Sequence, residues 1–316
     1  MDHAAAGPAL RAPARPGARA GAKRRREAAL AWLLLAPALA VFLLYRIIPL
    51  GWNAILSLQE WSPFKPAVWV GLDHYREMLT EDPTFWEALA NTLWFTASAP
   101  VGIAIALGIA LLVNTDVRGR DVYRTFVFIS YPLMTVAVGI IWRWMLDERV
   151  GLFNYALRSV GLIEQPIPFL QSFELALPSV IVANIWQIVG FYMIILLTGL
   201  QTIPRNLYEA AAIDGASARQ QFFRITLPLL RPSLFLCFVI GVMSSFTSFD
   251  LVYVMTNGGP GHSSELLVTY LYKAGFEMTR FDYAAALTVV QFALLVALTW
   301  IGNKASGGDA GAVERG

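Results

Sequence analysis

Six long apolar runs without a charged residue constrain this sequence more than any other feature. Each supplies close to the roughly 20 residues that an α-helix needs to cross the hydrocarbon core of a bilayer. With 57% hydrophobic and only 15% charged residues, the chain has more apolar side chains than one water-soluble core buries. We therefore predict an all-α, polytopic membrane protein with six transmembrane helices, at about residues 28–48, 88–113, 124–145, 176–201, 232–255 and 283–303.

Two short tails flank this predicted membrane domain of residues 28–304. Residues 1–27 are rich in Ala, Gly, Pro and Arg and end in a basic run, which predicts a disordered basic tail. A basic segment before an apolar one also begins a secretory signal peptide. Residues 28–45 are long for such a peptide and no evident small-residue cleavage site follows, so we favour a retained first span. Residues 305–316 form the second tail.

The distribution of Lys and Arg predicts the orientation, because segments rich in these residues stay in the cytoplasm. If the spans alternate, sixteen of the 24 cations lie on the side of both termini and eight on the other side. The basic tail contributes seven of the sixteen. We therefore expect a multi-pass plasma-membrane protein with both termini, and the loop between spans four and five, in the cytoplasm.

That loop reads EAAAIDGASARQQFFRITLPLLRP. Gly215 can take the left-handed conformation that ends a helix, and Ser217 and Gln220 have the spacing of a capping box. We expect Pro228 to stop the second helix and Pro232 to open the next span. The pattern predicts a cytoplasmic helix–turn–helix, although its periodicity alone also suits an amphipathic linker lying on the bilayer.

The order Glu-Ala-Ala, Asp-Gly-Ala and Ile-x-Leu-Pro in this loop resembles the EAA loop of the membrane subunits of binding-protein-dependent ABC importers. In that family the loop docks in a cleft of a cytoplasmic ATPase, which implies a coupling function here. The residues to which the resemblance gives this function are Glu209, Ala210, Ala211, Asp214, Gly215, Ala216, Phe222, Leu227 and Pro228.

Two further stretches extend the resemblance over most of the chain from Val70 onward. VGLDHYREMLTEDPTFWEALANTLWFT is similar to the entry of the second span in sugar-type permeases, although His74 stands where Asn is more usual. SFDLVYVMTNGGP is similar to the exit of their fifth span. The likeness is closest to maltose- and glycerol-phosphate-type subunits. It implies three kinds of protein partner: a second, similar permease, two cytoplasmic ABC ATPases and an external solute-binding protein.

We expect no catalytic, nucleotide or metal site on this chain. No Gly-Lys dipeptide occurs, so there is no P-loop, and ATP and magnesium are expected on the partner ATPase. None of the three histidines has metal-ligand spacing with another His or with the single cysteine, Cys237. We therefore predict that the chain binds no cofactor, that lipid surrounds it and that it has no nucleic-acid partner.

Polar residues in spans four and five are candidates for a substrate pathway. Asn184 and Gln187 are three residues apart, and hydroxyl residues recur at helical spacing in span five. In the family that the chain resembles, these spans line the central cavity, where such groups suit the hydroxyls and apolar faces of a sugar. Alternatively, Ser and Thr bond back to their own helix, and Asn and Gln join helices. The candidates are Asn184, Trp186, Gln187, Tyr192, Ser244 and Ser248.

The predicted function is the permease subunit of an ATP-driven ABC importer, which moves a sugar or related solute delivered by an external solute-binding protein. The alternative is a secondary transporter driven by protons or sodium, but such proteins usually place a carboxylate deep in a span. A membrane-embedded transferase would need clustered acids or histidines. The six runs hold no such groups, and spans four to six hold no Lys or Arg, which favours a neutral sugar over a phosphate ester.

Overall fold

The computed structural model describes residues 18–63, 65–115 and 119–305, and its contacts divide the chain after Asn53 into two units. The first unit is a helical rod, and none of its most apolar window is buried. Its elements are α1 (Ala18–Phe42), the π-helical turn η1 (Leu43–Ile47) and α2 (Ile48–Leu56), which runs on into the second unit.

Helix α1 begins ten residues before the predicted first span. Residues 18–27 are therefore helical, although the sequence predicted a disordered tail there. The physical reason is composition, since Ala, Lys, Arg and Glu are strong helix formers and this stretch contains no Pro. The rest of the predicted tail, and residues 306–316 of the second tail, lie outside the described residues.

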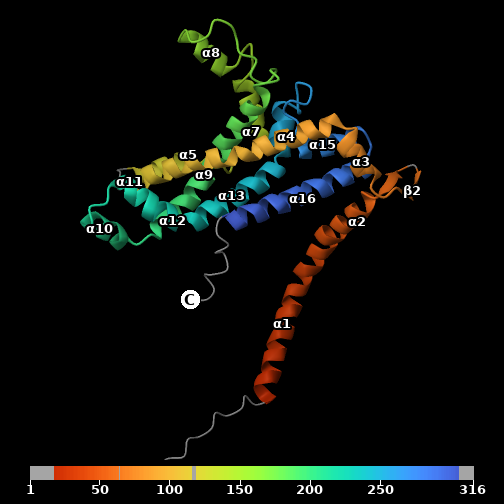
Figure 1. Ribbon diagram of the computed structural model, residues 1–316, viewed down its shortest axis with the longest axis horizontal. Helices are drawn as coiled ribbons and strands as arrows, with labels where there is room; N and C mark the ends of the chain where they lie inside the picture. Colours follow the sequence, from red (N-terminus) through yellow and green to blue (C-terminus); the bar gives the residue numbers. More distant parts are fainter. Residues whose placement is uncertain (1–17, 64, 116–118, 306–316) are drawn as a thin grey trace, which may run out of the picture. The chain divides into compact units, whose positions relative to one another are not determined.

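The second unit is a helical bundle in which α10 to α12 lie at one end and α3 with α15 at the other (Figure 1). Two π-helical turns, η2 (Phe222–Thr226) and η3 (Lys273–Glu277), interrupt its helices. Its α-helices are α3 (Asp73–Thr80), α4 (Pro83–Ala97), α5 (Ala99–Val113), α6 (Arg120–Phe128), α7 (Thr135–Met145), α8 (Leu152–Ser159), α9 (Ala176–Gln201), α10 (Arg205–Ile213), α11 (Ala218–Gln221), α12 (Leu227–Leu229), α13 (Arg231–Phe246), α14 (Phe249–Met255), α15 (Leu267–Tyr272) and α16 (Phe281–Ala305).

Four helices of the described residues are long and apolar enough to cross a membrane: residues 27–56, 83–113, 176–201 and 281–304. A fifth span results if the two segments that meet near Leu230, bent by 63°, count as one. The run predicted as the third span is broken, because α6 ends before Pro132 and the shorter apolar helix α7 begins after it. The count of six spans therefore stays a prediction.

A small antiparallel hairpin departs from the all-α prediction. Strand β1 (Gln59–Ser62) pairs with β2 (Lys65–Trp69), with Gln59 opposite Trp69 and an irregularity before Ser62. The strands are short and too irregular in their polar and apolar alternation to give a period-2 signal. The sequence patterns therefore missed the hairpin, and the architecture is helical with one two-stranded sheet.

The long helices of the second unit pack closely around buried apolar clusters. One cluster joins α5, α9 and α13, a second joins α7, α9 and α14, and a third joins α3, α4, α15 and α16. Gly190 of α9 lies against the backbone of Val127 and Phe128, where a Cβ atom would collide. The absence of a side chain therefore allows α9 and α6 to approach, as small residues do between membrane helices.

Candidate functional site

A polar cavity of about 420 Å³ lies where two of the apolar segments are broken. The connection between α6 and α7 forms one wall, α9 a second, and the junction of α13 and α14 at Thr247 and Ser248 a third. Broken helices leave room for such a cavity inside a bundle. The lining residues are Tyr131, Leu133, Thr135, Asn184, Gln187, Ile188, Ser244, Thr247, Ser248, Phe249 and Asp250.

Hydrogen bonds divide the hydroxyl residues of the fifth predicted span into two groups. Ser245 donates to the Gly241 carbonyl (2.8 Å) and Thr247 to the Met243 carbonyl (3.0 Å), so both bond back to their own helix. The Ser244 and Ser248 hydroxyls line the cavity and make no hydrogen bond to any described residue. They are free to meet water or a solute.

The two amides of α9 differ in the same way. Gln187 is buried, and its Nε2 donates to the Leu133 carbonyl (3.1 Å) and to Thr135 Oγ1 (3.3 Å), which ties α9 to the start of α7. The half-buried Asn184 amide has no hydrogen-bond partner among the described residues and borders the cavity. Gln187 therefore has a structural contact, whereas Asn184 remains available.

Two of the candidate pathway residues lie away from the cavity. Trp186 is 43% exposed and makes an edge contact with Trp142, with ring centroids 5.9 Å apart. Tyr192 is buried in the cluster that joins α5, α9 and α13. The structure thus brings together four of the six candidates: Asn184, Gln187, Ser244 and Ser248.

Sequence reasoning missed several residues of the cavity wall. Tyr131 precedes Pro132, and its ring stacks on Phe191 at 4.3 Å with an interplanar angle of 8°. Pro132 within an apolar run was the signal that could have revealed the break. Asp250, in the first turn of α14, also lines the cavity.

The loop between α9 and α13 has the predicted helix–turn–helix geometry. Gly215 has φ +77°, the left-handed value, after α10. The capping box is complete: Ser217 Oγ accepts from the Gln220 backbone (3.3 Å), and Gln220 Oε1 accepts from the Ser217 backbone (2.7 Å). Pro232 lies in the first turn of α13, as predicted.

Pro228 does not stop the second helix, contrary to the prediction. It lies in the first turn of α12, which follows η2 without a break, and the chain bends only near Leu230. Pro228 therefore lies near the end of a continuous helical segment, which continues through it without the backbone hydrogen bond that a proline cannot donate. The helical segment therefore reaches Leu229 before α13 begins.

Apolar side chains of this loop are exposed on an ordered support. Ile213 is 87% exposed and Phe223 54% exposed, while Glu209 and Asp214 are exposed beside them. The Tyr208 hydroxyl is hydrogen-bonded to Thr226 (2.9 Å), which holds α10 against η2. An exposed mixture of apolar and acidic side chains on fixed helices is a feature of interaction surfaces.

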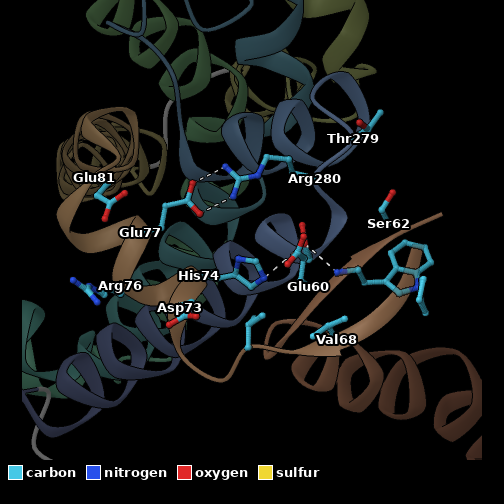
Figure 2. Close-up of a pocket in the computed structure, with 14 residues that line it drawn as sticks. Glu60, Ser62, Val68, Asp73, His74, Arg76, Glu77, Glu81, Thr279 and Arg280 are labelled. Carbon is cyan, nitrogen blue, oxygen red and sulfur yellow. Dashed lines mark hydrogen bonds and ion pairs between the residues drawn. The ribbon is translucent and has the colours of Figure 1, made fainter. Parts of the chain in front are cut away.

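A second, larger cavity of about 750 Å³ lies between the hairpin, α3 and the start of α16. In Figure 2 the Glu77 carboxylate faces the Arg280 guanidinium. Arg280 Nη1 donates to Glu77 Oε1 and Nη2 donates to Oε2, each at 2.6 Å. This bidentate contact raises the pKa of Arg280. His74 Nε2 lies 3.1 Å from the Gln59 carbonyl and 3.7 Å from Asp282 Oδ2. No group of three metal-binding side chains occurs among the described residues.

Membrane-length helices and a polar cavity at broken segments are features of membrane transport proteins. Residues 99–304 match the family described as the binding-protein-dependent transport system inner membrane component. The chain belongs to this family. It is a membrane permease subunit of a binding-protein-dependent ABC importer, and ATP hydrolysis belongs to a separate component.

Named relatives agree with this assignment. The sulfoquinovosyl glycerol transport system permease protein SmoG of Agrobacterium fabrum is 35% identical over 274 residues, which cover 85% of this chain and 88% of SmoG. The trehalose/maltose transport system permease protein MalF of Thermococcus litoralis is 34% identical over 283 residues, which cover 87% of this chain and 92% of MalF. These similarities give no support to the alternative of a secondary transporter.

Solved structures show the same fold. A chain of a bacterial ABC transporter involved in the import of the acidic polysaccharide alginate superposes with a TM-score of 0.77 at 26% identity, covering 91% of this chain and 98% of that one. A chain of the bacterial alginate ABC transporter in complex with an alginate pentasaccharide-bound periplasmic protein superposes with a TM-score of 0.78 at 25% identity. The match covers 90% of this chain and 96% of that one.

Proposed function

We propose that this chain is one of two permease subunits of an importer for a neutral sugar, with six spans and both termini in the cytoplasm. The observation that supports this proposal is the polar cavity. The Asn184, Ser244 and Ser248 side chains that line it make no hydrogen bond to any described residue. Such groups suit the hydroxyls of a sugar, and Tyr131 and Phe249 supply apolar ring faces beside them.

The charge of the cavity supports an uncharged solute. No Lys or Arg lines it among the described residues, and the Asp250 carboxylate does. An anionic solute would have to lose its hydration beside a carboxylate without a paired cation, which is costly. The relatives include an importer of an acidic polysaccharide, so the charge of the solute has to be measured for this chain.

The exposed helical loop is the proposed contact with the ATPase. Glu209, Asp214 and the exposed Ile213 would enter the cleft of a cytoplasmic ABC ATPase, and Gly215 would set the angle between α10 and α11. A second permease would complete the cavity, and a second ATPase would bind that permease. An external solute-binding protein would deliver the sugar to the opposite side of the membrane.

Solute binding and uptake test this proposal together. The solute-binding protein is titrated by calorimetry with maltose, trehalose, maltotriose and glycerol 3-phosphate, and the transporter is then assayed in proteoliposomes with the same compounds. We expect a neutral sugar to bind, to stimulate ATP hydrolysis and to be imported. Import of glycerol 3-phosphate alone would contradict the neutral-sugar assignment, and import without added ATP would contradict the importer mechanism.

A further inference from the structure

A series of aromatic rings connects the two cavities described above. Trp61 lines the larger cavity and Phe249 lines the polar one. Five rings form a continuous series, with centroid distances of 5.9 Å for Trp61–Phe281, 5.7 Å for Phe281–Phe276, 5.1 Å for Phe276–Tyr272 and 4.9 Å for Tyr272–Phe249. The sixth ring, Tyr253, lies beside the end of the series, 5.0 Å from Phe249 and 5.7 Å from Tyr272. We call Trp61, Phe281, Phe276, Tyr272, Tyr253 and Phe249 the aromatic ribbon.

The ribbon is not part of a buried core. Its rings are half-buried or exposed, and Phe276 is 65% exposed. In contrast, core rings of the same unit such as Phe85 and Phe95 are at most 2% exposed. The Tyr253 and Tyr272 hydroxyls make no hydrogen bond to any described residue. Rings that only filled space between helices would be covered, so the ribbon has accessible surface and free hydroxyl groups.

Ion pairs hold the supporting elements of the ribbon in place. Lys273, the neighbour of Tyr272, donates to buried Glu265 (2.7 Å) and to the Asn257 carbonyl (2.8 Å). Arg280, the neighbour of Phe281, forms the bidentate pair with Glu77. These contacts hold the start of η3 and the start of α16 in place. The rings are therefore presented by a fixed backbone, which lowers the entropic cost of binding a ligand.

Polar groups accompany the apolar rings at both ends of the ribbon. Glu60, Arg76 and Glu81 line the larger cavity together with Trp61, and Asp250, the chain neighbour of Phe249, lines the polar cavity. A pyranose ring has an apolar face of C–H groups and an equatorial rim of hydroxyls. A row of aromatic rings bordered by hydrogen-bonding groups matches both features, whereas a lipid tail would not need the polar border.

We propose that the aromatic ribbon is a transfer path, along which pyranose rings pass from the larger cavity to the polar cavity by successive contacts with the accessible edges and faces of neighbouring rings. This inference rests on the proposed sugar-import function and adds a route to it. Neighbouring ring centroids from Trp61 to Phe249 are at most 5.9 Å apart, so a sugar can contact the next ring before it leaves the previous one. The path keeps the released sugar close to the permease instead of returning it to the outside solution.

The test uses the complete transporter in proteoliposomes, with whichever of maltose, trehalose or maltotriose its solute-binding protein retains. Tyr272→Leu and Phe276→Leu remove ring faces at the middle of the ribbon without opening a core. Tyr272→Phe and Phe276→Trp keep an aromatic face. Phe292→Leu, on an exposed position of α16 outside the ribbon, is the matched control. The readout is the amount of sugar imported per ATP hydrolysed.

We expect both leucine variants to lower sugar imported per ATP by roughly two- to tenfold, while the loaded binding protein still stimulates hydrolysis. The aromatic replacements and Phe292→Leu should retain most of the parental ratio. Equal ratios in the leucine and aromatic variants would overturn the proposal. Loss of co-purification with the partner permease in the leucine variants alone would also overturn it, because the ribbon would then be a subunit contact. A parent that imports none of the three sugars would contradict the proposed function as well.

Discussion

At the scale of single residues, Asn184 and Gln187 have the same chemistry but different surroundings. The Gln187 amide is occupied by the Leu133 carbonyl and Thr135, whereas the Asn184 amide has no partner among the described residues. Their three-residue spacing puts both on one side of α9, so the sequence pattern predicted the same substrate-pathway function for both residues. Only the position of α7 distinguishes a contact that supports the fold from a group that is available to a solute.

Replacing each amide with leucine should separate these two functions. Asn184→Leu should lower sugar uptake roughly five- to a hundredfold with an unchanged Tm, because a desolvated hydroxyl loses its partner at a cost of about 1–3 kcal/mol. Gln187→Leu should lower the Tm, because it leaves the Leu133 carbonyl without its donor. Uptake assays and thermal unfolding of the same preparations measure both effects. An unchanged uptake in Asn184→Leu would assign that residue a structural function.

At the scale of elements, the geometry of the exposed loop depends on one left-handed turn. Gly215 has φ +77° and no atom within 4 Å of its missing Cβ, so a side chain there would add backbone strain without a collision. Gly161, which follows α8, has φ +73° and the same open surroundings. A side chain at either position would therefore introduce a similar backbone strain, at different places in the chain.

Gly215→Val should therefore lower ATPase binding and sugar uptake together, whereas Gly161→Val should leave both close to the parental values. Each substitution is expected to cost about 1–2 kcal/mol of backbone energy, so strain alone does not distinguish them. Glu209→Lys tests the charge of the same loop and should have the effect of Gly215→Val. ATPase pull-down and coupled hydrolysis are the measurements. Normal binding and coupling in both loop variants would leave the loop as an amphipathic linker.

At the scale of the whole molecule, the orientation proposed from the cation distribution can be tested by cysteine labelling. In a Cys237→Ala background, Ala218→Cys and Ser159→Cys should react from opposite sides of the membrane. Both positions are exposed. An impermeant maleimide applied to sealed cells should label only Ser159→Cys. Labelling of both positions from outside would contradict the six-span topology.

The sequence by itself determined that this is a helical membrane protein with long apolar segments and a helical loop, because these depend on local composition, spacing and turn chemistry. The transporter class came from the resemblance of that loop to a known family. The Gly215 turn and the capping box needed only residues that are close in the chain. The polar cavity depended on tertiary structure, since it forms where the breaks near Pro132 and Thr247 meet α9. The aromatic ribbon joins Trp61 to Phe281 and Tyr272 to Phe249, and the sequence separations are too long for any periodic pattern to record. Packing alone decided which polar groups are paired and which remain free.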